Sequence, residues 1–390
     1  MSNQFILSFA FEAMWQVIVP WFAEHILGLE EPITVFTNGS GDTLYNYLSI
    51  LCYAIVSGIA TIIWSSLDAR RPNYEKLMEW VIILIRYYIV YEMIMYGLAK
   101  VFYMQFQPPR FGRLIQDYGD SSPMGLMWTF MGFSKGYTIF AGVGELIGGL
   151  LLLFRRTTTL GALIVFGVMF NVMMMNFCYD IPVKLLSSHL VLLSGLLIAL
   201  DGKRLFRTFI LNRPTESVPM PPLFKDPVHE KAKIIAKWII VAIGLGIFLV
   251  GSITQLQFMK NRKPLFHGLY EVESFERNGE IIPPLTTDST RWDKIAIDFK
   301  NRASIRTMNG KTRWYSFEPD TTDQTIAYHL TSDTVNVYTL GYSWPDSNQF
   351  VLEGITDGDT LRIVTTQKTK DDFLLTNRGF HWVNPYPFNR

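Results

Sequence analysis

The stretch GYTIFAGVGELIGGLLLLFRR, residues 136–156, decides the fold of this chain. Between Tyr137 and Phe154 its only charged residue is Glu145, and it ends in Arg155-Arg156. A run of this length is just able to span a bilayer, and an arginine pair is typical of the cytoplasmic end of a span. A carboxylate near the bilayer centre is costly unless it has a partner, a proton or a function. The stretch therefore predicts a membrane helix whose acid needs an explanation.

The chain has 390 residues, and nearly all of its long apolar runs lie before residue 257. We predict an α-helical polytopic membrane bundle of about seven spans, at residues 5–25, 44–64, 77–101, 137–154, 160–177, 185–200 and 238–256. The first span is the weakest prediction, because Glu12, Gln16 and Pro20 also fit a tilted or interfacial helix.

Lysine and arginine near the span ends predict the orientation. One set of loops holds thirteen of them and the other set holds four. The richer set faces the cytoplasm by the positive-inside rule, which places the N-terminus inside and everything after Leu256 outside. The net charge of +1 gives no reason to expect nucleic acid as a partner. Cys52 and Cys178 are scattered, so we expect two buried thiols and leave a bridge between them as an alternative.

After residue 263 short alternating runs replace the long apolar ones, at residues 269–275, 292–299, 304–308, 312–317, 325–330, 335–342, 350–352, 360–366 and 373–375. Asn278-Gly279, Asn309-Gly310 and Asp357-Gly358 are typical of tight hairpin turns. The pattern predicts an all-β domain, either an antiparallel barrel or a sandwich. Such a domain is a folded adaptor or cap, or else a barrel that holds a ligand.

The last thirteen residues, RGFHWVNPYPFNR, are rich in aromatic side chains. We expect this tail to plug the barrel or dock on the β domain; the alternative is the membrane interface or the long outer loop. The whole chain then divides into two N-terminal spans (1–76), a four-helix core (77–201), a proline-rich cytoplasmic linker (202–232), a last span (233–258) and the β domain (263–390).

Counting residues from the cytoplasmic ends places polar side chains of different spans at similar depths. Arg86 and Glu145 share the midplane, which predicts a structural ion pair. A second group lies nearer the outside and is a candidate ligand-binding pocket, with Glu92, Tyr88, Tyr96, Lys100, Asn171 and His189. The alternative is that these side chains serve packing and internal hydrogen bonds only.

Two outer loops are candidates for a lid. The long loop, residues 102–136, contains an uncharged Met- and Trp-rich stretch at 123–133 that is too short to span and is expected at the interface or between helices. The short loop, residues 176–184, carries Asp180 and Lys184, which are spaced to pair with each other or with charges of the long loop. The candidate lid residues are Arg113, Asp117, Asp120, Trp128, Asp180 and Lys184.

Residues 77–201 resemble the DoxX-like family of integral membrane proteins. The matching features are Arg86, Gly97 and Lys100, the motif Glu145-x-x-Gly148-Gly149, Arg155-Arg156 before Gly161-Ala162, and Asp201. The resemblance implies a four-helix membrane core. The extra spans and the β domain resemble larger Bacteroidota-type members, which implies the bacterial inner membrane with the β domain in the periplasm. Some relatives are subunits of quinone oxidoreductases, while others serve in maturation or cargo handling.

Our leading hypothesis is that the core binds a small amphiphile, a quinone or a lipid, in its outer half, as a redox-associated subunit. An alternative is a non-enzymatic anchor or assembly protein whose periplasmic β domain binds a partner protein. A weaker alternative is a proton-coupled transporter, against which the chain shows no inverted repeat. The sequence contains no zinc-ligand spacing and no nucleotide-binding motif, and it does not decide whether the chain is an enzyme.

Overall fold

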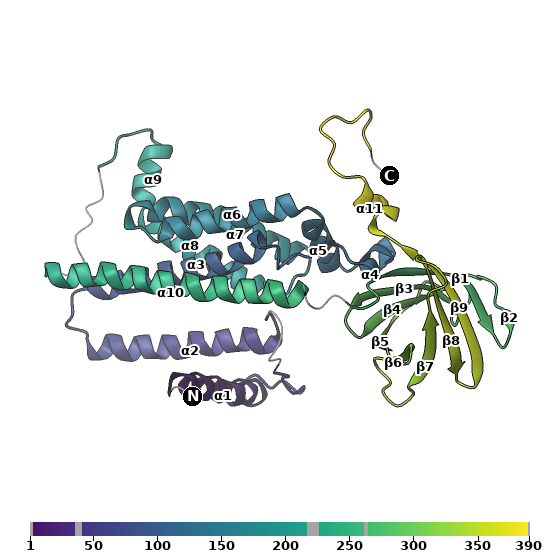
Figure 1. Ribbon diagram of the computed structural model, residues 1–390. Helices are drawn as coiled ribbons and strands as arrows, with labels where there is room; N and C mark the ends of the chain where they lie inside the picture. The colour runs from purple at the N-terminus through teal and green to yellow at the C-terminus, as the bar shows by residue number, and fades with distance from the viewer. Residues whose placement is uncertain (1–2, 36–40, 217–225, 261–263, 389–390) are drawn as a thin grey trace. The chain divides into compact units, whose positions relative to one another are not determined.

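In a computed structural model the chain is described over residues 3–35, 41–216, 226–260 and 264–388 (Figure 1). It forms two compact units. The first contains Met1–Tyr103 and Gly136–Lys233, and the second contains Met104–Lys135 and Ile234–Arg390. The expected linker prolines Pro219, Pro221 and Pro222 and the first residue of the predicted β domain, Lys263, lie outside the described residues.

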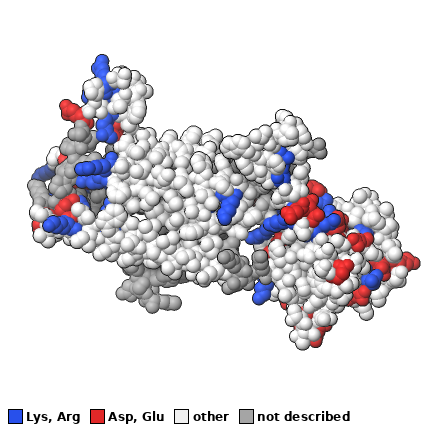
Figure 2. All heavy atoms as spheres, turned by 45° about the horizontal axis from the view of Figure 1, so that its top comes forward, with Lys and Arg blue, Asp and Glu red and all other residues white. Residues whose placement is uncertain are grey.

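Each predicted span is found as a helix. The long helices are α1 (Asn3–His25), α2 (Leu44–Leu67), α3 (Glu75–Val101), α6 (Lys135–Leu152), α7 (Thr158–Cys178), α8 (Lys184–Leu200) and α10 (Pro227–Lys260). Among the described residues five helices are long and apolar enough to cross a membrane, and the number is six if α8 and α9 (Gly202–Phe209), bent by 73°, form one span. Figure 2 shows a wide surface without charge over the helices. The chain is a multi-pass membrane protein, and a membrane-spanning α1 stays a prediction.

Glycines set the register between α3 and α6. A Cβ atom at Gly142 would lie 2.6 Å from the carbonyl oxygen of Gly97, and one at Gly149 would lie 2.8 Å from the Cβ atom of Met93. The two backbones therefore touch, which only residues without a side chain allow. Gly148 has the same role toward α7, where its Cβ would meet Val165 at 2.7 Å.

The connection between α3 and α6 belongs to the second unit, together with the β domain, although α3 and α6 themselves belong to the first. It contains the single turns α4 (Phe111–Leu114) and η1 (Tyr118–Asp120) and the helix α5 (Pro123–Phe133). Ser122 caps α5 by accepting a hydrogen bond from the Gly125 amide, with Pro123 at the first helical position. The Met- and Trp-rich stretch is thus helical, and its place at a membrane interface stays a prediction.

The β domain is a closed up-and-down antiparallel barrel (Figure 1). Its strands are β1 (Gly268–Arg277), β2 (Glu280–Ile281), β3 (Trp292–Phe299), β4 (Arg302–Thr307), β5 (Thr312–Asp320), β6 (Thr325–Leu330), β7 (Tyr338–Ser343), β8 (Gln349–Thr356) and β9 (Asp359–Lys368). β1 pairs with β3, each strand from β3 to β8 pairs with the next strand in sequence, and β1 also pairs with β9, which closes the barrel. β2 is a short addition beside β1. The Asn278-Gly279 and Asp357-Gly358 turns have positive φ at both residues, as expected.

Two predictions for this domain are wrong. Residues 373–375 do not form a strand: the chain there makes the turns η3 (Lys370–Asp372) and α11 (Leu374–Asn377), because Asp372 caps the Thr369 amide and hydroxyl. The tail does not plug the barrel. The barrel interior is filled by its own large side chains, among them Tyr270, Phe275, Phe317 and Phe350, each less than 2% exposed.

The expected linker and thiols are also corrected in part. Helix α9 occupies Gly202–Phe209 and α10 already begins at Pro227, so the irregular connection is shorter than predicted. Cys52 is buried, whereas Cys178 is exposed at the end of α7. Both cysteines are free, and the alternative of a bridge between them is wrong.

Candidate functional site

Glu145, the acid in residues 136–156, forms an ion pair with a lysine of α3. The Nζ atom of Lys100 lies 2.8 Å from both carboxylate oxygens of Glu145 and donates hydrogen bonds to them. Only 7% and 2% of the two side chains is exposed. The ring of Tyr96, one turn before Lys100, lies with its centroid 5.5 Å from the Lys100 ammonium. Close approach of α3 and α6 at Gly97 and Gly142 brings the two charges together.

The predicted ion pair between Arg86 and Glu145 is wrong. Arg86 is buried, and its guanidinium donates to the carbonyl oxygen of Leu152 at 2.7 Å and 3.2 Å. Leu152 is the last residue of α6, where a cation stabilises the free carbonyls of the helix end. The prediction assumed that the start of α3 and the end of α6 lie at the same depth. The contacts of Gly149 with Met93 and of Leu152 with Arg86 show instead that the first turns of α3 extend beyond the last residue of α6.

The predicted ligand pocket is not assembled. Glu92 and Tyr88 hydrogen-bond to each other along α3. Asn171 and His189, however, are both exposed on their helices, and His189 Nδ1 contacts the Leu185 carbonyl of its own helix at 2.7 Å. Of the six candidates, the structure brings only Lys100 and Tyr96 to the buried charge, and it keeps Glu92 and Tyr88 as a separate pair.

The C-terminal end of α7 and the N-terminal end of α8 hold a polar cluster that the sequence did not reveal. Buried Asn176 donates to Ser187 Oγ at 3.0 Å and to the Val183 carbonyl at 3.1 Å. Asp42, from the α1–α2 connection, accepts hydrogen bonds from the amides of Lys184 and Leu185 and so caps α8. A capping residue that is distant in sequence leaves no local pattern to recognise.

Asp201 fixes the opposite end of the same helix pair. Its carboxylate accepts a hydrogen bond from Thr159 Oγ1 at 2.8 Å and pairs with Arg204. Thr159 lies in the first turn of α7. The aspartate after the last core helix therefore ties the ends of α7 and α8 together, which gives this motif residue a structural role.

The α3–α6 connection is seated on the outer wall of the barrel. Asp298 of β3 accepts hydrogen bonds from the amides of Phe111 at 3.0 Å and Gly112 at 2.7 Å. Phe111 and Ile115 are buried against the outward side chains of Leu269 and Ala296. We call residues 110–117 the docking segment.

Charged contacts extend the same interface. Arg306 donates to both carboxylate oxygens of Asp117, at 3.1 Å and 2.9 Å, and to the Ile115 carbonyl. Arg110 lies over the ring of Phe299 at 4.2 Å. Lys370 Nζ donates to the Pro109 carbonyl at 2.8 Å, and burial lowers the pKa of this lysine. The docking segment is thus held from β3, β4 and the turn after β9.

The remaining lid candidates make local contacts. Arg113 donates to Thr129 and Gln116 of its own loop, and Trp128 packs edge-on against Phe106. Asp180 and Lys184 form the predicted ion pair at 2.7 Å. Asp120 accepts a hydrogen bond from Gln116 through its backbone carbonyl. Closure of these loops over the bundle stays a prediction.

A polytopic helical membrane protein that carries a closed β barrel is the class that this geometry defines. The DoxX family model matches residues 81–176. The uncharacterized protein YwoB of Bacillus subtilis (strain 168) is 34% identical over 126 residues, which is 32% of this chain and 79% of that protein. No solved structure matches the chain. The chain belongs to the DoxX family, and the match covers the helices that hold Lys100 and Glu145.

Proposed function

We propose that this chain is a non-enzymatic anchor and assembly protein whose DoxX-like core holds the β barrel at the surface of the bacterial inner membrane. The observation that carries the proposal is the contact of the docking segment with β3 and β4. In this contact Asp298 accepts hydrogen bonds from the Phe111 and Gly112 amides. The loop that joins two core helices is built into the barrel. In this arrangement the core is the support and the periplasmic barrel is the working part.

A partner must bind to the surface of the barrel, because the described interior is packed with side chains and the strands form a closed ring. Closure also removes the free strand edges to which an extended peptide could add. A partner must therefore bind to the loops at an end of the barrel or to its outer wall.

The end of the barrel far from α10 has the character of a protein-binding face. β1 begins at Gly268, eight positions after the end of α10, and runs ten residues to the far end. The β6–β7 loop and the end of β8 there expose Val335 (87%), Val337 and Ile355. The Tyr338 hydroxyl bonds to Asp357 and joins these two elements.

Two carboxylates lie beside this far-end patch. Asp333 lies in the β6–β7 loop and Asp357 at the β8–β9 turn, whereas Asp359 of the same turn pairs with Arg277 at 3.8 Å. A hydrogen bond from the Asn336 amide lowers the pKa of Asp333, so this carboxylate is ionised at neutral pH. An apolar centre with an acidic rim suits a partner protein with an apolar contact surrounded by lysine or arginine.

Site-specific photo-crosslinking in cells tests this proposal. A photo-reactive residue at Val335 in the full chain should give an adduct that is lost when Ile355→Asp is added and weakened when Asp333→Lys is added. The matched control is Ser347, exposed in the β7–β8 turn at the other end. No adduct at Val335, or one insensitive to Ile355→Asp, would contradict partner binding at this face.

A second candidate function keeps the core as the working part. The buried Lys100–Glu145 pair with Tyr96 beside it combines charge and an aromatic ring between apolar helices, which suits the polar head of a quinone or a lipid. Mass spectrometry of molecules that co-purify with the wild type and with Glu145→Gln tests it. Identical co-purifying molecules in equal amounts would count against binding at this pair.

A further inference from the structure

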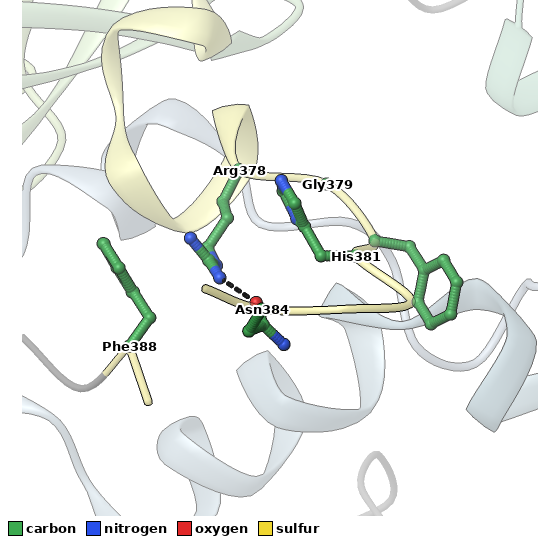
Figure 3. Close-up of a pocket in the computed structure, with 6 residues that line it drawn as sticks. Arg378, Gly379, His381, Asn384 and Phe388 are labelled. Carbon is green, nitrogen blue, oxygen red and sulfur yellow. Dashed lines mark hydrogen bonds between the residues drawn. The ribbon is translucent and has the colours of Figure 1, made fainter. Parts of the chain in front are cut away.

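The C-terminal tail forms a hook of its own beyond the barrel (Figure 3). The guanidinium of Arg378 donates to Asn384 Oδ1 and lies 4.0 Å from the centre of the Phe388 ring, while Gly379 turns the chain with a positive φ of 65°. These contacts close residues 378–388 around a small hollow lined by Arg378, Gly379, Phe380, His381, Asn384 and Phe388. The hook is therefore a shaped element that presents the residues between Arg378 and Asn384.

The tip of the hook is apolar and its side chains are exposed to solvent. Phe380 is 84% exposed, Trp382 88% and Val383 77%. Two large aromatic rings in water cost free energy in proportion to their exposed area, and three exposed apolar side chains within four residues are unusual on a soluble domain. Tryptophan and phenylalanine in such a cluster favour the interfacial zone of a bilayer.

Charge favours a lipid surface as well. Between Phe373 and Arg390 the sequence contains Arg378, His381 and Arg390 but no Asp or Glu. The remaining surface of the β domain carries charges of both signs (Figure 2). Basic residues beside exposed aromatic residues are the composition that binds anionic headgroups.

The root of the hook contacts a segment that is close in sequence to a membrane span. Lys370 bonds to the Pro109 carbonyl, and Phe373 packs with the Phe111 cluster of the docking segment. Pro109 follows the end of α3 by only eight residues, a reach of at most about 28 Å. The hook therefore starts within reach of the bilayer that α3 crosses.

We propose that residues 378–388 are a membrane-contact element that places Phe380 and Trp382 in the headgroup zone of the same bilayer and so clamps the barrel against it. The hook adds a contact point to the two covalent connections, α10 and the α3–α6 connection. This inference stands independently of partner binding at the far end of the barrel.

Spin-label accessibility on the full chain in nanodiscs tests the clamp. Cys52 and Cys178 are replaced by Ser, and a nitroxide is attached to a single His381→Cys, between the two aromatic residues. The label should be several-fold more accessible to oxygen than to a water-soluble nickel reagent in discs that contain phosphatidylglycerol. The control label at Val335→Cys, with nearly the same exposure as Trp382, should have the opposite preference.

Two further arms make the result decisive. Adding Phe380→Ser and Trp382→Ser to the His381→Cys chain should give the label the accessibility of the Val335 control. Equal, water-like accessibility at both labels in nanodiscs would overturn the proposal. It would also be overturned if the His381 label were shielded from both reagents in native membrane vesicles only, because a protein would then be the partner of the hook.

Discussion

Lys100 and Glu145 face each other across the contact between α3 and α6, with the ammonium 2.8 Å from both carboxylate oxygens. Lys100→Met leaves a buried carboxylate without a partner, which is expected to cost about 3–5 kcal/mol. We predict a clear fall in the melting temperature of the purified protein in detergent. The double variant Lys100→Met/Glu145→Leu should recover most of the loss, because it removes both charges. A double variant as unstable as the single one would contradict a role for the pair itself.

The exposed pair of Arg71 and Asp68 is the control for this series. Surface pairs contribute about 0–1 kcal/mol, so Asp68→Ala, which also removes a hydrogen bond from the Tyr74 hydroxyl, should lower the melting temperature far less than Lys100→Met.

Gly142 permits the approach that brings the pair together. A methyl group there would lie 2.6 Å from the Gly97 carbonyl oxygen, so Gly142→Ala forces α3 and α6 apart at an expected cost of about 1–3 kcal/mol. Gly167→Ala is the matched change, since a Cβ at Gly167 meets nothing within 4 Å. Thermal unfolding in detergent compares the two, and equal stability of both variants would exclude tight packing at Gly142.

Asp298 holds the docking segment through two amides. Asp298→Ala should release this segment, with hydrogen exchange at residues 110–116 faster by about tenfold, equivalent to about 1.4 kcal/mol. Asp346 is the control, because it also accepts hydrogen bonds from two amides but only within its own β7–β8 turn. If Asp346→Ala accelerated exchange at 110–116 as much, the effect would not be specific to the docking segment.

Two tyrosines in the barrel core predict its behaviour in alkali. Burial raises the pKa of Tyr270 and of Tyr328 to about 12. Free tyrosine ionises near pH 10, so between about pH 10 and 12 the unfolded chain releases protons that the folded barrel retains. Stability of the barrel should be unaffected below pH 10 and should fall above it, by about 2–3 kcal/mol per tyrosine at pH 12.

Denaturant unfolding of the full chain, followed by near-ultraviolet circular dichroism, measures this slope. Tyr328→Phe removes one of the two tyrosines with the largest shifts and should reduce the loss between pH 10 and 12 by about 2–3 kcal/mol. An unchanged slope in Tyr328→Phe would show that this tyrosine ionises alike in both states.

The spans, eight of the nine predicted strands and the hairpin turns could be predicted from sequence, since hydrophobic periodicity and Asn-Gly or Asp-Gly turns are local. The partner of Glu145 could not. The partner depends on the axial offset between α3 and α6. The close contacts of Gly97 with Gly142 and of Met93 with Gly149 set this offset, whereas the ends of the apolar runs do not. The predicted cluster failed for a similar reason, because depth does not determine which face of a helix Asn171 or His189 occupies.

The seat of the docking segment had no sequence pattern either. Asp298 lies in a β strand, about 190 residues from the amides that it holds, and neither region alone indicates the contact. The tail was predicted to plug the barrel or dock on the β domain, with the membrane interface or the long outer loop as the alternative. It lies outside because the barrel interior is already filled by aromatic residues such as Tyr270 and Phe350.

Formation of a disulfide between the docking segment and β4 tests most directly that the core loop is built into the barrel. A Cβ at Gly112 would lie 3.1 Å from Ser304 Oγ, so Gly112→Cys and Ser304→Cys should form a disulfide on oxidation. In the variant used for this test, Cys52 and Cys178 are replaced by Ser and a protease site is inserted after Asn212. Cleavage at this site places the two new cysteines in different fragments. We predict that the two fragments stay joined after cleavage in the absence of reductant. The control is Gly119→Cys with Ser304→Cys, which should not join the fragments because a Cβ at Gly119 meets nothing within 4 Å. Fragments that separate equally in both variants would contradict the account.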